Sequence, residues 1–275
     1  MSGNGEQIEY WNGSVGERWA KLQETIDASL AEIGKAALAF AGARPGERVL
    51  DIGCGCGTTT LALSKAVGAG GSITGVDISA PMLAVARARG AATGVNFLEA
   101  DASAHIFHPT HDLVFSRFGV MFFSDPPSAF ANIRKALKPG GRLAFVCWRS
   151  AAENLWASAP FAAARELLPP QPAPDPLAPG PFAFADGERL KGILETAGYR
   201  GIRVEVLDTT MYMGADADEA AAQALNIGPL ARAALELDDA TRAKIRGVVK
   251  ATLGKFAGPK GVTPPAACWL VGAVN

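Results

Sequence analysis

The sequence predicts an α/β fold built on a parallel sheet that carries helices on both faces. Short runs rich in β-branched residues alternate with segments of helical period between residues 47 and 148. Glycine-rich stretches, such as 51–57 and 139–141, mark the boundaries between these segments. Parallel neighbours need a crossover connection, and helices that cover both faces of the sheet usually supply it.

The first element is expected to be one amphipathic helix over residues 14–40, because its apolar side chains recur at steps of three and four. Gly42 and Pro45 are expected to end it. Five strands follow in the prediction, at 47–53, 72–78, 95–100, 111–116 and 141–148. Three helices are expected between them, at 58–67, 80–92 and 126–137.

The second half of the chain is less regular. Residues 169–181 hold seven prolines in thirteen positions, which favours an extended surface linker. A helix is expected at 186–197, and two more strands are expected at 201–207 and 266–274. The intervening residues 209–264 read as a mostly helical insert. Such an insert either caps a pocket or forms a dimer surface, and the usual placement of pockets favours the cap.

Composition limits the classes of partner. The chain has 275 residues, 49% of them hydrophobic and 19% charged, and its formal net charge of −1 argues against a nucleic-acid partner. The sequence contains no apolar run of roughly 18 residues, so no membrane span is expected. Its start lacks the basic and apolar regions of a signal peptide. Four cysteines in a chain of this length predict no disulfide framework, and a cytoplasmic protein is expected.

The stretch VLDIGCGCG (49–57) ends a predicted strand and opens a helix, where glycines allow a tight turn and a close approach to a ligand. A dinucleotide fingerprint would need a third glycine at position 58, which is Thr58. Asp51 suits a ligand with an ammonium group or a positive centre. Asp77, at the tip of the second strand, suits the two hydroxyls of a ribose. Asp101 and Ala102, just past the third strand, suit an adenine edge, and together these features describe S-adenosylmethionine.

These motifs resemble those of the class I S-adenosylmethionine-dependent methyltransferases, specifically the small-molecule group similar to the ubiquinone/menaquinone C-methyltransferases. The matching stretches span 49–148 and are VLDIGCGCG, GVDIS with a following ML, EADA, DLVFSRFGVMFF and LKPGGRLAFVCW. The resemblance implies a Rossmann-like sheet of seven strands in the order 3-2-1-4-5-7-6, with the last strand antiparallel. The N-terminal helix region (1–45) is of a kind that this family uses as a lid, and residues 46–208 and 265–275 are expected to form the cofactor-binding domain. The helical insert (209–264), expected to be a cap, is where such enzymes diverge.

The resemblance also implies roles for individual residues. Asp51 would orient the methionine moiety, Asp77 would hold the ribose, and the Ser116–Arg117 backbone would lie beside the methionine end. The other positions expected to bind the cofactor are Gly53, Cys54, Gly55, Thr58, Ile78, Met82, Asp101 and Ala102. Ile78 and Met82 would pack on the adenine, and Asp101 and Ala102 would contact its amino group.

Neither the cysteines nor the histidines predict a metal site. A structural zinc site needs four ligands, whereas Cys147 and Cys268 are expected in strands away from Cys54 and Cys56. The latter two are interpreted as small residues in a tight loop. The three histidines (His105, His108 and His111) fall in one stretch and are interpreted as solvated loop residues.

The predicted reaction is transfer of the methyl group of S-adenosylmethionine to a small, partly hydrophobic metabolite, which leaves S-adenosylhomocysteine. An in-line displacement of an activated methyl group depends on alignment in a dry pocket more than on acid–base chemistry. If a base takes part, Tyr10 is the candidate. The residues expected to shape the acceptor pocket are Trp11, Trp19, Arg117, Phe118, Met121, Phe122, Trp148, Arg149 and Asn154. A non-catalytic binder of S-adenosylmethionine, an NAD-dependent oxidoreductase and a homodimeric assembly remain as alternatives to test.

Overall fold

The computed structural model describes residues 4–170 and 175–275 and contains a seven-stranded sheet in the order β3-β2-β1-β4-β5-β9-β6. β9 runs antiparallel to both of its neighbours, whereas the other paired strands are parallel. Counted along the chain, β9 is the seventh strand of this sheet, so the predicted fold and strand order are confirmed. The strands are β1 (Arg48–Ile52), β2 (Ser72–Asp77), β3 (Asn96–Glu99), β4 (His111–Arg117), β5 (Leu137–Trp148), β6 (Arg200–Thr210) and β9 (Pro265–Val274).

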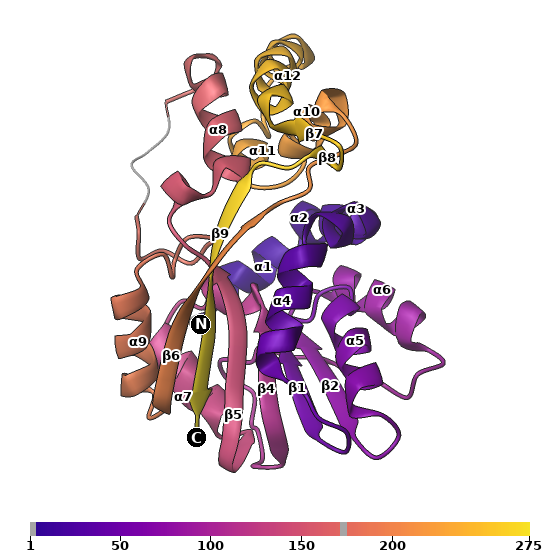
Figure 1. Ribbon diagram of the computed structural model, residues 1–275, viewed down its shortest axis with the longest axis vertical. Coiled ribbons are helices and arrows are strands. Elements are labelled where there is room, and N and C mark those ends of the chain that lie inside the picture. Colours follow the sequence, from indigo (N-terminus) through magenta and orange to yellow (C-terminus); the bar gives the residue numbers. More distant parts are fainter. Residues whose placement is uncertain (1–3, 171–174) are drawn as a thin grey trace.

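Helices cover both faces of the sheet, as Figure 1 shows. On one face lie α4 (Ala31–Ala41), α5 (Thr58–Val67) and α6 (Ala80–Gly90), and on the other lie α7 (Pro126–Arg134) and α9 (Gly187–Thr196). The central strands are therefore buried on both faces, and the side chains of Leu113, Phe115 and Phe145 are fully enclosed. Burial of this kind is why these strands are continuous apolar runs rather than alternating ones.

The N-terminal region differs from the prediction of one helix over 14–40. It contains α1 (Gly5–Asn12), α2 (Ser14–Lys21), α3 (Gln23–Ser29) and α4. The helix breaks at Leu22 (φ −97°, ψ 16°) and at Leu30 (φ −96°, ψ 7°). The backbone leaves the helical conformation at both residues, although neither of them is a glycine or a proline. These two breaks redirect the chain so that α1–α3 lie over the end of the sheet while α4 packs against it (Figure 1). Gly42 ends α4 with a φ of +56°, as predicted.

Boundaries elsewhere shift by a few residues. α5 has the predicted bounds, but β5 begins at Leu137, before the glycines that were expected to precede it. The extension arises because His111 of β4 pairs with Leu137, followed by a register shift. α7 consequently ends at Arg134 rather than at residue 137. The predicted linker 169–181 includes residues 171–174, which lie outside the described residues.

A second group of helices lies beyond the sheet, at the far end of β6 and β9 (Figure 1). Within residues 209–264 the chain forms α10 (Ala217–Ala224), α11 (Pro229–Ala233), α12 (Asp239–Leu253) and a hairpin of β7 (Ala257–Gly258) and β8 (Gly261–Val262). α12 buries Ile245, Val249 and Leu253, and it packs with α10 against α8 (Leu155–Ala164). None of the helices in residues 4–170 and 175–275 is both long enough and apolar enough to cross a membrane.

Candidate functional site

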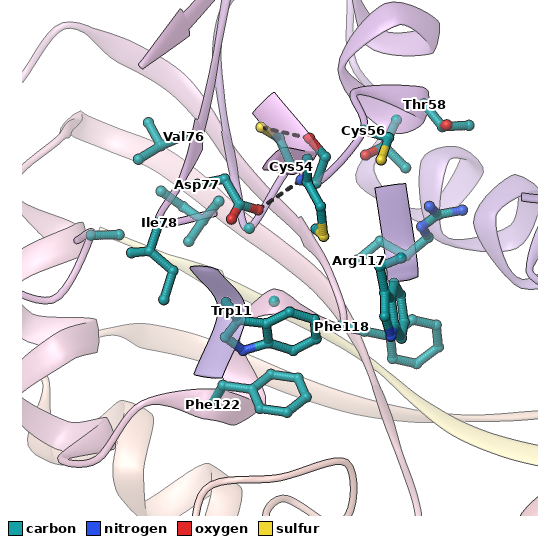
Figure 2. Close-up of a pocket in the computed structure, with 18 of the residues that line it drawn as sticks. Trp11, Cys54, Cys56, Thr58, Val76, Asp77, Ile78, Arg117, Phe118 and Phe122 are labelled. Atoms are coloured by element: carbon teal, nitrogen blue, oxygen red, sulfur yellow. Dashed lines mark hydrogen bonds between the residues drawn. The ribbon is translucent and has the colours of Figure 1, made fainter. Parts of the chain in front are cut away.

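A cavity opens at the carboxyl ends of β1, β2, β3 and β4, beneath α1–α3. Its lining comes from the loops after these four strands and from the N-terminal helices. Figure 2 shows Asp77 and Ile78 on one side of the cavity, the loop of Cys54 and Cys56 above it, and Arg117 on the other side. In open parallel sheets this edge is where ligands bind, because the loops that follow neighbouring strands converge there.

The glycine loop after β1 brings bare backbone to the cavity. Gly53 and Gly55 have positive φ angles of 65° and 54°. A Cβ atom on Gly53 would lie 2.6 Å from the Cα atom of Gly119, so the close approach of the two loops needs glycine at this position. Both predicted glycines and Cys54 line the cavity, and Thr58 does so at the first turn of α5.

Asp77 is held in place by backbone groups. Its carboxylate accepts hydrogen bonds from the Gly55 N–H (2.7 Å) and from the Ser79 N–H (2.9 Å). Burial raises the pKa of Asp77 above its ordinary value, although these two hydrogen bonds favour the ionised form. Ile78 and Met82 line the cavity beside it. The carboxylate is therefore fixed and oriented before any ligand binds.

Asp101 has one satisfied and one unsatisfied oxygen. Its Oδ1 accepts from the Asn4 amide (3.1 Å), the Ser103 N–H (2.9 Å) and the Ser103 hydroxyl (2.7 Å). Its Oδ2 is buried and has no hydrogen-bond partner among the described residues. Asp101 and Ala102 line the cavity. A buried acceptor without a donor is costly, so this oxygen suits a ligand that carries an N–H group.

Two predicted cofactor residues lie behind the cavity rather than in its lining. The Asp51 side chain is fully buried, and its Oδ2 accepts hydrogen bonds from the Thr59 (2.8 Å) and Thr60 (2.7 Å) hydroxyls. Burial raises the pKa of Asp51 to about 6. The buried Ser116 hydroxyl accepts from the Gly119 N–H (3.2 Å). Both side chains brace the loops around the cavity. The Asp51 carboxylate is outside the lining, which corrects the expectation that it orients the methionine moiety directly, whereas the expectation for Ser116 concerned its backbone beside Arg117.

Charged groups gather at the end of β4. The Arg117 guanidinium lies 3.5 Å from Oδ1 of Asp27, which belongs to α3. The other oxygen of Asp27 accepts from the Thr58 hydroxyl (2.5 Å) and from the Gln23 amide, and it lies 3.4 Å from the Arg89 guanidinium. Asp27, Gln23 and Arg117 line the cavity. Sequence reasoning missed Asp27, because an acid on the polar side of an amphipathic segment carries no motif.

Aromatic rings form one wall of the cavity. Trp11, Trp19, Phe118 and Phe122 line it, and the Trp11 ring makes edge-to-face contacts with Trp19 (5.5 Å) and Phe122 (5.1 Å between ring centres). Figure 2 shows the Trp11 and Phe122 rings across the cavity from Asp77. Phe118 has a φ of +66°, which is rare for a bulky residue and is often found at functional sites.

Tyr10 does not reach the cavity, which corrects its choice as the candidate base. The residue is 36% exposed, and the Arg232 guanidinium lies 5.9 Å from the centre of its ring. Tyr10 and Trp11 both belong to α1, so successive side chains on the helix point in different directions. Trp11 turns inward and Tyr10 outward.

Four residues expected in the acceptor pocket also lie outside its lining. Met121 and Trp148 are buried, and Trp148 stacks on Phe118 from behind with ring centres 4.3 Å apart. Asn154 is buried and hydrogen-bonds the backbone N–H (2.9 Å) and carbonyl (3.0 Å) of Ala267. Arg149 pairs with Asp208 and Glu153. Of the four, Trp148 is the one with a ring contact to a residue of the wall, and none of them is in the lining.

Several lining residues were not among those expected to bind a ligand, although some of them lie within the matching stretches. They come from the N-terminal helices or from strand ends and are mostly apolar. Besides Gln23 and Asp27 they are Asn4, Ile26, Leu30, Ile52, Cys56, Thr59, Val76, Ala100, Gly119 and Phe123. Asn4 is the one whose polar contact, with Asp101, ties the start of the chain to the cavity.

The two cysteines of the glycine loop are unsuited to ion binding as they stand. Burial raises the pKa of Cys54 well above its usual range and that of Cys56 to about 11, so both thiols keep their protons at neutral pH. Among the residues that the structure describes, no group of three or more His, Cys, Asp or Glu side chains is arranged to hold a metal ion.

Comparisons with known proteins identify the family of the chain. A family model for a methyltransferase domain matches residues 49–141. The ubiquinone/menaquinone biosynthesis C-methyltransferase UbiE of Stutzerimonas stutzeri is 30% identical over 203 residues, which covers 69% of this chain and 79% of that protein. Other proteins of that name match over 43% and 63% of their own length.

Two solved structures share the fold. A SAM-dependent methyltransferase from Aquifex aeolicus matches with a TM-score of 0.52 at 20% identity, over 92% of this chain and 96% of that one. Phosphoethanolamine N-methyltransferase 2 from Haemonchus contortus, in complex with S-adenosyl-L-methionine, matches with a TM-score of 0.54 at 21% identity, over 89% of this chain and 52% of that one. The chain therefore belongs to the class I S-adenosylmethionine-dependent methyltransferases and is similar to the ubiquinone/menaquinone biosynthesis C-methyltransferases.

Proposed function

We propose that this cavity binds S-adenosylmethionine and that the protein transfers its methyl group to a small, planar and partly apolar acceptor. The observation that carries the proposal is the unpartnered, buried Oδ2 of Asp101, which shares one cavity with the Asp77 carboxylate and the glycine loop. An adenine amino group would supply the missing donor. The two hydroxyls of the ribose would donate to Asp77, and Ile78 and Met82 would pack on the purine.

The glycine loop supports this assignment, since it lets a ligand approach the backbone between the adenosine end and the end of β4. Gly55 has a φ of +54°, which favours glycine, and a Cβ atom on it would lie 3.0 Å from the terminal methyl of Met82, so that this cavity-lining side chain would have to shift. The loop has Thr58 at the position where the dinucleotide fingerprint has its third glycine, so it lacks the pattern that binds a pyrophosphate. This argues against a nicotinamide cofactor.

S-adenosylmethionine supplies a methyl group that its sulfonium already activates. The residues of the chain would bind and orient the two substrates and exclude water, which is the source of the rate enhancement in a reaction of this kind. The inward-facing rings of Trp11 and Phe122 would stabilise a nearby positive centre by cation–π attraction of about 0.5–2 kcal/mol. With Tyr10 turned outward, we assign no side chain as a general base.

The acceptor is proposed to be a planar ring of the kind that the names of the relatives suggest, a quinone precursor. The aromatic wall supports this choice, because flat apolar molecules pack well against Trp and Phe rings. Arg117 adds one positive charge beside that wall.

The insert is proposed to act as a cap that supports the lid from outside. The Gln223 amide donates to the Ser29 hydroxyl (2.6 Å), which joins α10 to the end of α3. Arg232 of α11 lies over the Tyr10 ring of α1. The insert therefore contacts the lid helices, whereas the lining of the cavity comes from the lid and the strand ends.

The test is turnover of methyl-labelled S-adenosylmethionine against a panel of hydroquinones, other phenols and aromatic acids. Labelled product from a hydroquinone, together with S-adenosylhomocysteine, is expected. Calorimetry with S-adenosylhomocysteine and with NADH separates the alternatives. Tight S-adenosylhomocysteine binding without turnover of any acceptor would favour a non-catalytic binder, and tight NADH binding without it would favour an oxidoreductase.

A further inference from the structure

The cavity offers two opposite charges where the amino-acid part of S-adenosylmethionine would lie. Figure 2 shows Arg117 beside Cys56, on the opposite side of the Cys54 loop from Asp77. If the adenosine rests on Asp77 and Asp101, a ligand that passes the glycine loop extends toward Arg117 and Asp27. Asp51, the acid that the motif suggests for this end, is enclosed behind the loop and is absent from the lining.

Arg117 has unused hydrogen-bonding capacity. Its guanidinium carries five N–H donors in a planar fork that matches a carboxylate. In residues 4–170 and 175–275 its one hydrogen bond is the contact with Asp27 at 3.5 Å, which is longer than the 2.7–2.9 Å of a close charged pair. The guanidinium lies against Gly34 of α4, where a Cβ atom would be 3.4 Å from its Nη1, an ordinary contact distance. Donors therefore remain free for a ligand.

Asp27 is fixed from one side and open on the other. Its Oδ2 is engaged by Thr58, Gln23 and Arg89, whereas its Oδ1 meets only the distant Arg117 among the described residues. If Arg117 turns to a ligand, Arg89 still balances the negative charge of the Asp27 carboxylate. Oδ1 is thus positioned to accept from a cation while the rest of the side chain stays in place.

We propose that Asp27 and Arg117 together bind the α-ammonium and the α-carboxylate of the methionine moiety of S-adenosylmethionine. The two ligand charges are separated by one carbon atom, and the two protein charges adjoin each other in the lining. The inference rests on the proposed function, and it makes the lid helix α3 a direct contributor to cofactor binding. Closing the lid would then complete the amino-acid end of the site.

The experiment compares S-adenosylhomocysteine with 5′-methylthioadenosine, which keeps the adenosine and the sulfur but lacks the amino-acid part. Calorimetry is done on the full chain and on Arg117→Gln and Asp27→Asn. Each variant is expected to bind S-adenosylhomocysteine at least tenfold more weakly, while its affinity for 5′-methylthioadenosine stays within about twofold of the unsubstituted protein. Unchanged binding of the short ligand also shows that the variant is folded.

The matched control is Arg142→Gln, which breaks the ion pair with Glu47 at the opposite end of the sheet and should leave both affinities unchanged. Equal losses for both ligands in Arg117→Gln and Asp27→Asn would overturn the inference, because they would indicate general damage to the site. Unchanged affinity for S-adenosylhomocysteine in both variants would also overturn it, and an accompanying rise in the acceptor KM would assign the pair to the acceptor. If the unsubstituted protein binds neither ligand, the proposed function itself fails.

Discussion

Replacing Asp77 by alanine removes the carboxylate that is proposed to hold the ribose. In the structure each oxygen of this carboxylate accepts one backbone N–H, from Gly55 or from Ser79, and each keeps a further lone pair for a ligand. Two ribose hydroxyls can therefore be accepted without breaking either contact. The geometry makes Asp77 a preorganised acceptor whose loss should be felt mainly in ligand binding.

The expected loss follows from the two hydrogen bonds. Hydrogen bonds to a charged group contribute about 1.5–3 kcal/mol each. Burial raises the pKa of Asp77, which means that its charged form is less favourable in the folded protein, so the two bonds together contribute less than their sum to ligand binding. A total of about 2–4 kcal/mol corresponds to a Kd for S-adenosylhomocysteine that is roughly 30- to 1000-fold higher. Isothermal calorimetry measures this directly. Asp77→Asn is the matched variant, because the amide keeps the size of the side chain and one acceptor oxygen.

A second ligand separates a lost contact from a disturbed loop. 5′-Methylthioadenosine and its 2′,3′-dideoxy analogue form a double-mutant cycle with Asp77→Ala. Removing the hydroxyls should weaken binding to the unsubstituted protein and change little in the variant. If Asp77→Ala lowers the affinity for the dideoxy analogue as much as it lowers the affinity for 5′-methylthioadenosine, Asp77 does not hold the ribose and the reasoning is refuted.

Three further predictions follow from the same region. The pKa of Asp51, raised from 3.8 to about 6, means that the folded state binds more protons between these values, so stability falls as pH rises through this window. In urea unfolding, the free energy of unfolding of Asp51→Asn should rise by roughly 1 kcal/mol relative to that of the unsubstituted protein as the pH goes from 5 to 7. A difference between the two proteins that does not change with pH would contradict this. Gly53→Ala should cost about 3 kcal/mol or more, from its positive φ and the clash with Gly119, against about 1 kcal/mol for Gly46→Ala, which has open space. Equal costs would refute the close approach. Asp101→Asn should raise the Kd of 5′-methylthioadenosine about tenfold by calorimetry, and an unchanged Kd would remove Asp101 from the site.

The sheet could be predicted from sequence because its signals are local. Buried parallel strands are continuous apolar runs, and glycines with positive φ angles mark where they end, as at Gly53 and Gly55. The acids at the strand tips follow from the same boundaries, which is why Asp77 and Asp101 were found. The breaks at Leu22 and Leu30 could not be predicted, since both are ordinary apolar residues whose conformation depends on the packing of α2–α4 around the cavity.

The acceptor side of the site depended on contacts between distant segments. Trp148 ends a predicted strand and Asn154 follows it, and both were expected to face the cavity. β9 pairs with β5 as far as Trp148, whose ring stacks on Phe118, and Ala267 of β9 hydrogen-bonds the buried Asn154, so neither side chain is in the lining. Asp27 shows the reverse case, because it reaches the cavity only through the folding of α3 over β4. Sequence patterns carry no record of such long-range pairing.

The most direct measurement is a crystal structure of the protein grown with S-adenosylhomocysteine. Electron density for the compound is expected under α1–α3, with its ribose hydroxyls at hydrogen-bonding distance from Asp77 and its adenine amino group on the Oδ2 of Asp101. Density for the compound at any other place on the molecule, or a cavity that stays empty at saturating concentration, would contradict the account.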